Sequence, residues 1–281
     1  MPDTAADLEE LGFGTLWVAN GPGMLQTAAR LLAATERLTV ATGIVNIWVH
    51  AADDVATVYR QVEGDHPGRF LLGLGNGPRE TAQWALSPYR ELTRYLDRLD
   101  AAGVADHARI VAAVGPRMLG LAAARSRGAH PFLGTAEHTA QAREILGDRP
   151  LLAPEVKVVL EPDPATARAI ARQALEFYLT KRGYSGNLRR LGFTDEDLAG
   201  GGSDRLIDAV VAWGDPDAIA RRIAEHHQAG ANHVAVQVLD WQTDAPDRSQ
   251  RRLPRAHYEQ LAALAISRCG GCGGRGRPRR P

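Results

Sequence analysis

The chain has 281 residues, of which 44% are hydrophobic and 23% charged, an ordinary composition for a globular protein. Its 33 Lys and Arg balance 33 Asp and Glu, which argues against a dedicated nucleic-acid binder because such proteins usually carry a basic excess. No apolar run reaches the roughly 18 residues of a membrane span, and the N-terminus lacks a basic start followed by an apolar core, so we expect neither a membrane protein nor an exported one.

The end of the chain differs in composition from the rest. Residues 268–281 contain five Arg, five Gly and no acidic residue, which is typical of a disordered segment. We therefore predict one domain over 1–267 and a disordered tail over 268–281. Both cysteines lie in this tail; a lone pair falls short of the four ligands of a zinc site, so no metal site is expected. A body without cysteines is typical of a cytoplasmic protein.

Short apolar runs alternate with helical patterns along nearly the whole chain. The spacing predicts strands over 15–18, 38–45, 69–74, 109–114, 129–133, 155–160 and 233–239. Helices are predicted before and between them, over 5–10, 24–36, 53–62, 87–99, 119–125, 136–146, 163–181 and 215–229. The segment 184–202 is predicted to be a loop.

This alternation predicts an α/β fold with a parallel sheet covered by helices. Seven strands are predicted, whereas a (β/α)8 barrel needs eight. The helix that opens the chain has no strand before it. The pattern therefore favours a (β/α)8 TIM barrel whose sequence starts after its first strand.

Several stretches carry a family pattern in a fixed order, covering roughly residues 5–240. They are Glu9–Val18, Thr42–Asn46, Gly68–Gly75, Gly115–Leu119 with Ala122–Ala124, and the runs WGDPDAIARRI from Trp213 and AGANHVAVQVL from Ala229. Together they resemble the luciferase-like family, in its coenzyme F420-dependent oxidoreductase branch of actinobacterial type. The resemblance implies a bacterial luciferase-like barrel, a deazaflavin across its C-terminal mouth, a small organic substrate and, as in many members, a homodimer. It also implies an open edge between the strands at 15–18 and 233–239.

The C-terminal ends of barrel strands face the active site. The resemblance implies that the cofactor is bound there by Asn20, Gly43, Ile44, Leu74, Gly75, Asn76, Val114, Gly115, Pro116 and Arg117. Gly43–Ile44 matches a bulge, often with a non-proline cis peptide, behind the ring. Residues 74–76 would line the ring, and residues 114–117 would hold the phosphate at a helix N-terminus, with Arg69 and Arg79 as further cations. The same stretches are also typical of an ordinary tight turn and a helix start.

Catalytic groups are less clearly marked. Some deazaflavin-dependent dehydrogenases have Asp-His and Glu where this chain has Asn20, Gly21 and Asn76. Asparagine has no pKa suited to proton transfer, so His50 and His130 are the remaining candidates, although a lone histidine is more often structural. An enzyme without an acid–base pair could take its proton from solvent, which favours reduction by the reduced cofactor.

Two alternatives remain open at this point. The same fold could bind FMN and act as a luciferase-like monooxygenase. The chain could also be a truncated or non-catalytic cofactor-binding protein, because the first strand and the acidic positions are missing. A Rossmann dinucleotide site is a poor fit, since the glycines of residues 73–77 are followed by Pro78 where a helix should start.

Overall fold

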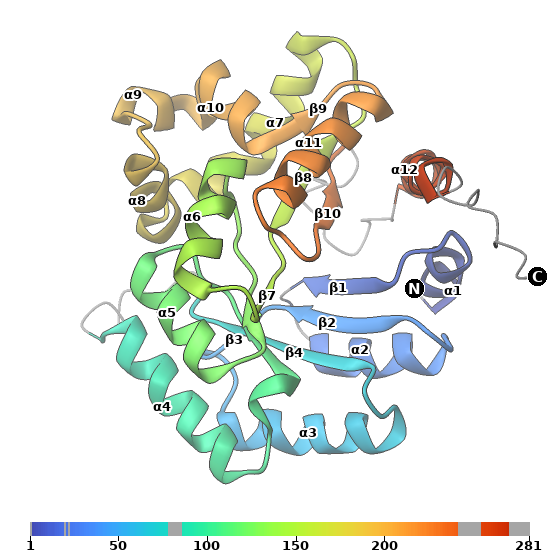
Figure 1. Ribbon diagram of the computed structural model, residues 1–281, viewed down its shortest axis with the longest axis vertical. Coiled ribbons are helices and arrows are strands. Elements are labelled where there is room, and N and C mark those ends of the chain that lie inside the picture. Colours follow the sequence, from blue (N-terminus) through green and yellow to red (C-terminus); the bar gives the residue numbers. More distant parts are fainter. Residues whose placement is uncertain (1, 20, 22, 78–85, 241–253, 270–281) are drawn as a thin grey trace, which may run out of the picture.

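The strands form two curled parallel sheets with helices outside them (Figure 1). The computed structural model describes residues 2–19, 21, 23–77, 86–240 and 254–269. The N-terminal sheet follows the chain order: β1 (Thr15–Ala19), β2 (Thr39–Gly43), β4 (Phe70–Gly75), β5 (Arg109–Val111), β6 (Gly128–Ala129) and β7 (Leu151–Leu152), with β3 (Val45–Asn46) also paired to β4. In the C-terminal sheet, β8 (Glu155–Val159) lies between β9 (Val211–Trp213) and β10 (Ala235–Val238).

Helices separate the strands and mostly begin at side chains that cap them. Ser87, Thr135 and Asp215 each accept a hydrogen bond from the backbone N–H three residues later, which satisfies a donor that the helix itself cannot pair. The helices are α1 (Pro2–Glu10), α2 (Met24–Ala33), α3 (Ala52–Asp65), α4 (Pro88–Ala101), α5 (Pro116–Arg125), α6 (Ala136–Leu146), α7 (Pro164–Leu179), α8 (Arg182–Arg190), α9 (Asp195–Leu198), α10 (Asp204–Val210), α11 (Pro216–Gln228) and α12 (Arg255–Cys269).

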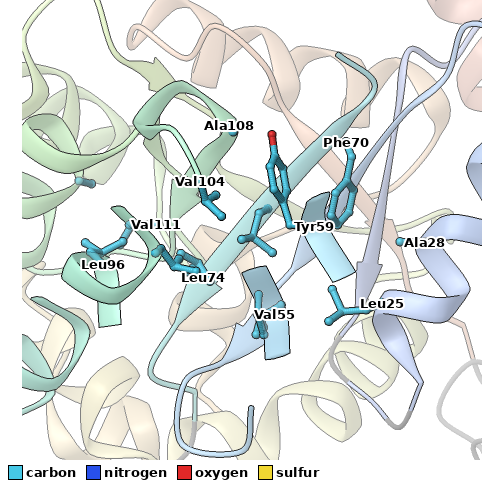
Figure 2. Packing of buried hydrophobic residues seen from close by; sticks show 14 of the residues in the cluster. Leu25, Ala28, Val55, Tyr59, Phe70, Leu74, Leu96, Val104, Ala108 and Val111 are labelled. Carbon is cyan, nitrogen blue, oxygen red and sulfur yellow. The ribbon is translucent and has the colours of Figure 1, made fainter. Parts of the chain in front are cut away.

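The largest apolar core lies between the N-terminal sheet and helices α2 to α5. Figure 2 shows Val55 and Tyr59 of α3 directed toward Phe70 and Leu74 of β4. The rings of Tyr59 and Phe70 stack with their centroids 6.0 Å apart. Alternate residues of β4 therefore face the helices, which leaves the intervening glycines to face the inside of the sheet.

The barrel is open between β1 and β10. Each of these strands pairs on one side, β1 with β2 and β10 with β8, and no described residue hydrogen-bonds β1 to β10. A cavity of about 220 Å³ lies between them. Leu8, Phe13 and Tyr258 line it together with residues of both strands. The prediction of a barrel that lacks its first strand, with an open edge at this place, is confirmed.

Several elements differ from the predictions. The segment 184–202, predicted as a loop, contains most of α8 and the short α9. Gly183 and Gly186 lower its helix propensity, but Leu188 is fully buried and packs in the C-terminal core. The predicted strand over 129–133 ends at residue 129.

Helix α12 is a further difference, because the spacing predicts neither this helix nor β7, α10 and β9. It ends at Cys269, so the first two residues of the predicted tail are helical; residues 270–281 lie outside the described residues. In the part of the chain that the structure describes, no helix has the length and apolar character needed to span a membrane.

Candidate functional site

The peptide bond between Gly43 and Ile44 is cis, as the resemblance implied. The Thr42 hydroxyl links this turn to β4, since it donates to the Gly73 carbonyl (2.9 Å) and accepts from the Gly73 N–H (2.8 Å). Ile44 then lies over the glycines of β4, with a side-chain carbon 3.1 Å from where a Cβ of Gly75 would stand. The protein's own packing thus requires the small residues of β4.

The glycine requirement is strictest at residue 73. A Cβ there would lie 1.8 Å from the Thr42 carbonyl oxygen. A backbone shift of a few tenths of an ångström would not remove such an overlap. At Gly43, in contrast, the nearest atoms would be 3.7 Å away, on Trp17 and His130. Space beside the cis peptide therefore lies on the Gly43 side, next to an aromatic pair.

That pair is Trp17 of β1 and His130, which follows β6. The two rings stack with centroids 3.9 Å apart and 10° between their planes. His130 Nδ1 lies 2.6 Å from the Ala153 carbonyl oxygen, which accepts hydrogen bonds only, so Nδ1 carries the proton and Nε2 is left as an acceptor. Complete burial lowers the pKa of His130, and its imidazole is therefore neutral at pH 7.

A second histidine continues this arrangement. The Trp17 indole N–H donates to His233 Nε2 over 3.2 Å, so the proton of His233 is on Nδ1. Burial lowers the pKa of His233, and the neighbouring His130 adds to the effect. The interior side of β1 and β10 thus presents two neutral imidazoles on either side of one indole.

A buried ion pair occupies the neighbouring part of the interior. Lys157 of β8 has a side chain that is 4% exposed, and its ammonium donates to Glu155 (2.9 Å) and to the side-chain oxygen of Gln237. The ammonium also lies 4.5 Å from the centroid of Phe132 and 5.6 Å from that of Tyr178. Sequence reasoning missed this group. Its signal was two charges at alternate positions, 155 and 157, of a strand predicted to be buried.

The two predicted catalytic histidines lie in different places. His50 borders a surface pocket of about 480 Å³, formed by the segment 47–52 and by α4, whereas His130 is inside the sheet. Trp48 Nε1 and the Tyr95 hydroxyl in that pocket have no hydrogen-bond partner. No described contact joins His50 to His130, so the structure does not form a two-histidine site.

The predicted ring-lining residues separate in a similar way. The Leu74 side chain is fully buried in the core under the helices, so the prediction that it lines the ring is wrong for the side chain, and its backbone alone faces the interior. Asn76 follows at the strand end, where its side-chain oxygen is buried without a hydrogen-bond partner. Asn20 lies outside the described residues, as does Arg79. Arg69 donates to Thr35 and to the Leu38 carbonyl at the opposite end of the strands, away from the mouth.

The predicted phosphate segment starts α5. Gly115 occupies the N-cap position without a side-chain cap, and Pro116 is the first helical residue. The Val114 carbonyl accepts a hydrogen bond from His138 Nε2 (2.8 Å), so backbone donors are the free groups at this end. Arg117, expected at the phosphate, has its guanidinium 4.8 Å from the centroid of the Tyr89 ring on α4. A different cation, Arg190 of α8, lies beside Gly115.

These residues fit a phosphorylated flavin or deazaflavin in two respects. The uncapped start of α5 offers backbone N–H groups and a positive helix end to an anion. The buried Asn76 oxygen is an acceptor that lacks a donor, and the rings of both cofactor types carry N–H groups. The described residues contain no group of three or more His, Cys, Asp or Glu placed to hold a metal ion.

Known proteins resemble this chain in part of its sequence and in its fold. A family model described as luciferase-like monooxygenase matches residues 1–100. The Bacillus subtilis protein YwcH, itself uncharacterised, is 32% identical over a stretch that covers 32% of this chain and 34% of that protein. The match thus spans about a third of the relative's length.

Solved structures extend the likeness to the whole fold. The coenzyme F420-dependent tetrahydromethanopterin reductase of Methanopyrus kandleri has a TM-score of 0.73 at 16% identity, over 95% of this chain and 96% of that one. An F420-dependent secondary alcohol dehydrogenase gives 0.69 at 12% identity, over 94% and 92%. The oxygenating constituent of 3,6-diketocamphane monooxygenase from Pseudomonas putida, in complex with FMN, gives 0.64 at 13% identity, over 94% and 90%. The resemblance to the luciferase-like family is thereby confirmed, in sequence over residues 1–100 and in fold over nearly the whole chain.

Proposed function

We propose that the chain is a coenzyme F420-dependent oxidoreductase that transfers a hydride between the deazaflavin and a small organic substrate. The observation that carries this proposal is the uncapped N-terminus of α5, together with the buried Asn76 oxygen at the end of β4 that lacks a donor among the described residues. The likeness to two F420-dependent enzymes supports it. The bound cofactor would supply a carbon atom that accepts or donates the hydride.

His130 is the residue of this chain that we propose for proton handling. Its Nδ1 proton is held by the Ala153 carbonyl, and its Nε2 lies toward Gly43. A neutral imidazole in this tautomer accepts a hydrogen bond or a proton at Nε2. Stacking on Trp17 keeps the ring in place. His50, in its separate surface pocket, takes no part in this arrangement.

An FMN-dependent luciferase-like monooxygenase is the second candidate. It is favoured by the description of the family model that matches residues 1–100 and by the fold likeness to an FMN complex. Both candidates use a phosphorylated tricyclic ring and a small substrate, so the cofactor itself is the property that separates them.

A pair of equilibrium titrations tests the proposal. The purified chain is titrated with coenzyme F420 and, separately, with FMN, and cofactor fluorescence is recorded. We expect micromolar binding of the deazaflavin and at least tenfold weaker binding of FMN, which corresponds to about 1.4 kcal/mol. Tighter binding of FMN would support the monooxygenase instead, and binding of neither cofactor would contradict both candidates.

A substitution at the helix start gives an internal control. Gly115→Asp puts a carboxylate where the phosphate is proposed to lie, and we expect it to remove cofactor binding through charge repulsion. Circular dichroism of the variant shows whether the fold is retained. An unchanged affinity for the cofactor would contradict the phosphate assignment at α5.

A further inference from the structure

Helix α8 lies across from the start of α5, although 66 residues of sequence separate the starts of these two helices (Figure 1). Arg190, the last residue of α8, has its Nη2 3.3 Å from where a Cβ of Gly115 would stand. No carboxylate of a described residue pairs with Arg190, while its neighbour Arg189 forms an ion pair with Asp195 (2.7 Å). The structure thus places an unpaired guanidinium at an uncapped helix N-terminus.

Asn187, one turn earlier on α8, contributes an independent observation. Its side chain is buried, with the residue 3% exposed, and its Oδ1 accepts from Arg190 Nη2 over 2.9 Å. This bond fixes the orientation of the amide. The other end, Nδ2, is buried and has no hydrogen-bond partner among the described residues. A buried donor left unpaired costs about 1–3 kcal/mol, which indicates that an acceptor belongs beside it.

Most of the groups that meet here are donors. The backbone N–H groups of Gly115 and Arg117 donate to no described residue, and Arg190 and Asn187 add a guanidinium and an amide N–H. The nearby acceptor, the Val114 carbonyl, is already bonded to His138. A cluster made mostly of donors at the positive end of a ten-residue helix is suited to an oxyanion, and a phosphate ester accepts such bonds on more than one oxygen.

We propose that Arg190 and Asn187 of α8 bind the phosphate of the cofactor together with the α5 N-terminus. The inference rests on the proposed function and adds the residues that recognise the phosphate. Arg190 is then the residue that makes the site prefer a phosphorylated cofactor over the same ring without its phosphate. Arg117, placed over Tyr89, is outside this set.

The test compares ring systems with and without phosphate. Coenzyme F420 and FMN are each paired with a phosphate-free form, the deazaflavin with a free ribityl chain and riboflavin. All four are titrated into the wild-type chain, Arg190→Gln, Asn187→Leu and the control Arg189→Gln. We expect Arg190→Gln to lower the affinity for the phosphorylated cofactor by at least tenfold, whichever of the two cofactors binds, because a charge-assisted hydrogen bond is lost. The affinity for the phosphate-free form should change less than twofold in Arg190→Gln. Arg189→Gln should leave the affinity for both forms unchanged.

Two results would overturn the inference. Equal weakening of the phosphorylated and phosphate-free forms by Arg190→Gln would mean that Arg190 supports the pocket in general. Unchanged affinity of the phosphorylated form would mean that it contacts no phosphate. Circular dichroism spectra of all variants confirm folding, and Asn187→Leu removes the buried amide without adding a charge, so it tests the same site separately.

A cofactor-independent measurement separates this inference from the proposed function. Inorganic phosphate is added to the ¹⁵N-labelled wild-type chain at constant ionic strength, with chloride as the reference. We expect the amide signals of Gly115 and Arg117 to shift in the wild type and in Arg189→Gln, and to stay in place in Arg190→Gln. Shifts without any flavin binding would retain the anion site and reject the proposed function. Absence of shifts in the wild type would reject the anion site.

Discussion

Each of the two sheets contains a buried cation, and the two cations have different surroundings. Arg109 begins β5 of the N-terminal sheet and donates to the carbonyls of Arg125 and Val104 and to the Asp100 carboxylate. It thereby joins the ends of α4 and α5 to the sheet. Lys157 of the C-terminal sheet donates to side chains alone, those of Glu155 and Gln237, inside the curve of the strands.

This difference shows where the candidate site lies. The interior of the N-terminal sheet is apolar, with Ala41, Leu71 and Ile110 packed together, so its cation is placed at the edge and ties the backbone. The interior near β8 and β10 has an ion pair and the neutral His233, and the neutral His130 lies at the border between the two sheets, after β6. Buried polar groups are costly unless they are satisfied, and their concentration on one side is the pattern expected where a ligand meets the protein.

The largest expected effect is at Arg109. Arg109→Met leaves three backbone carbonyls, those of Leu96, Val104 and Arg125, without this donor and Asp100 without its buried partner. We expect the free energy of unfolding to fall by about 3–5 kcal/mol. Urea denaturation followed by circular dichroism measures it. The more exposed Arg125, which shares Asp100, is the control, and Arg125→Met should cost less than half as much. A loss below about 1 kcal/mol at Arg109 would contradict a structural role.

Substitution of Lys157 should lower the free energy of unfolding less than substitution of Arg109, and a second substitution, at Glu155, should restore part of the loss. Lys157→Met leaves the Glu155 carboxylate without its cation, at a cost of about 3 kcal/mol, since Glu155 keeps some contact with water. The double variant Glu155→Gln/Lys157→Met should recover at least half of this loss, as a double-mutant cycle in urea will show. Additive losses would mean that the two side chains do not act as a pair.

A third prediction concerns the contact between the two regions. His226 of α11 bonds to Thr139 of α6 over 2.9 Å, and burial is the main cause that lowers the pKa of His226 from 6.5 to about 4. The unfolded chain binds a proton here below pH 6.5, while the folded chain does so near pH 4. The free energy of unfolding should therefore decrease as the pH falls through this window, by about 2–3 kcal/mol from this group.

Unfolding curves at pH 7, 6, 5 and 4 measure that slope, with His226→Gln as the comparison. Burial also lowers the pKa of His130 and His138. The His226→Gln variant should therefore keep the part of the pH dependence that comes from these two histidines and lose the part that comes from His226. The same dependence of the free energy of unfolding on pH in the wild type and in His226→Gln would show that His226 does not titrate in this window.

The smallest effects on the free energy of unfolding are expected at exposed ion pairs, which serve as a comparison for the buried cations Arg109 and Lys157. Arg94 pairs with Glu91 on α4, and Arg189 pairs with Asp195 beside α8. Arg94→Ala and Arg189→Ala should each change the free energy of unfolding by at most about 0.5 kcal/mol, because water screens exposed charges. A larger change at either position would mean that burial of the cation is not what distinguishes Arg109 and Lys157.

Part of the candidate site could be predicted from the sequence. Gly43, Ile44 and Gly115 lie at strand ends where a parallel α/β pattern puts them, and local signals such as Gly-Pro mark the helix start. The partner of Gly115 could not be predicted in this way. Arg190 lies in the glycine-rich segment 184–202 that was predicted as a loop, and its position depends on how Leu188 packs in the core, which no local pattern contains.

The sequence by itself determined the alternation of strands and helices and the parallel sheet, because apolar periodicity and capping residues act over a few positions. The open edge between β1 and β10 followed from the family resemblance. The tertiary structure alone decided which polar groups meet. His130 pairs with Trp17, Lys157 with Gln237, and Arg190 lies beside Gly115. Those contacts join residues 75 to 113 positions apart, and they depend on the packing of whole elements.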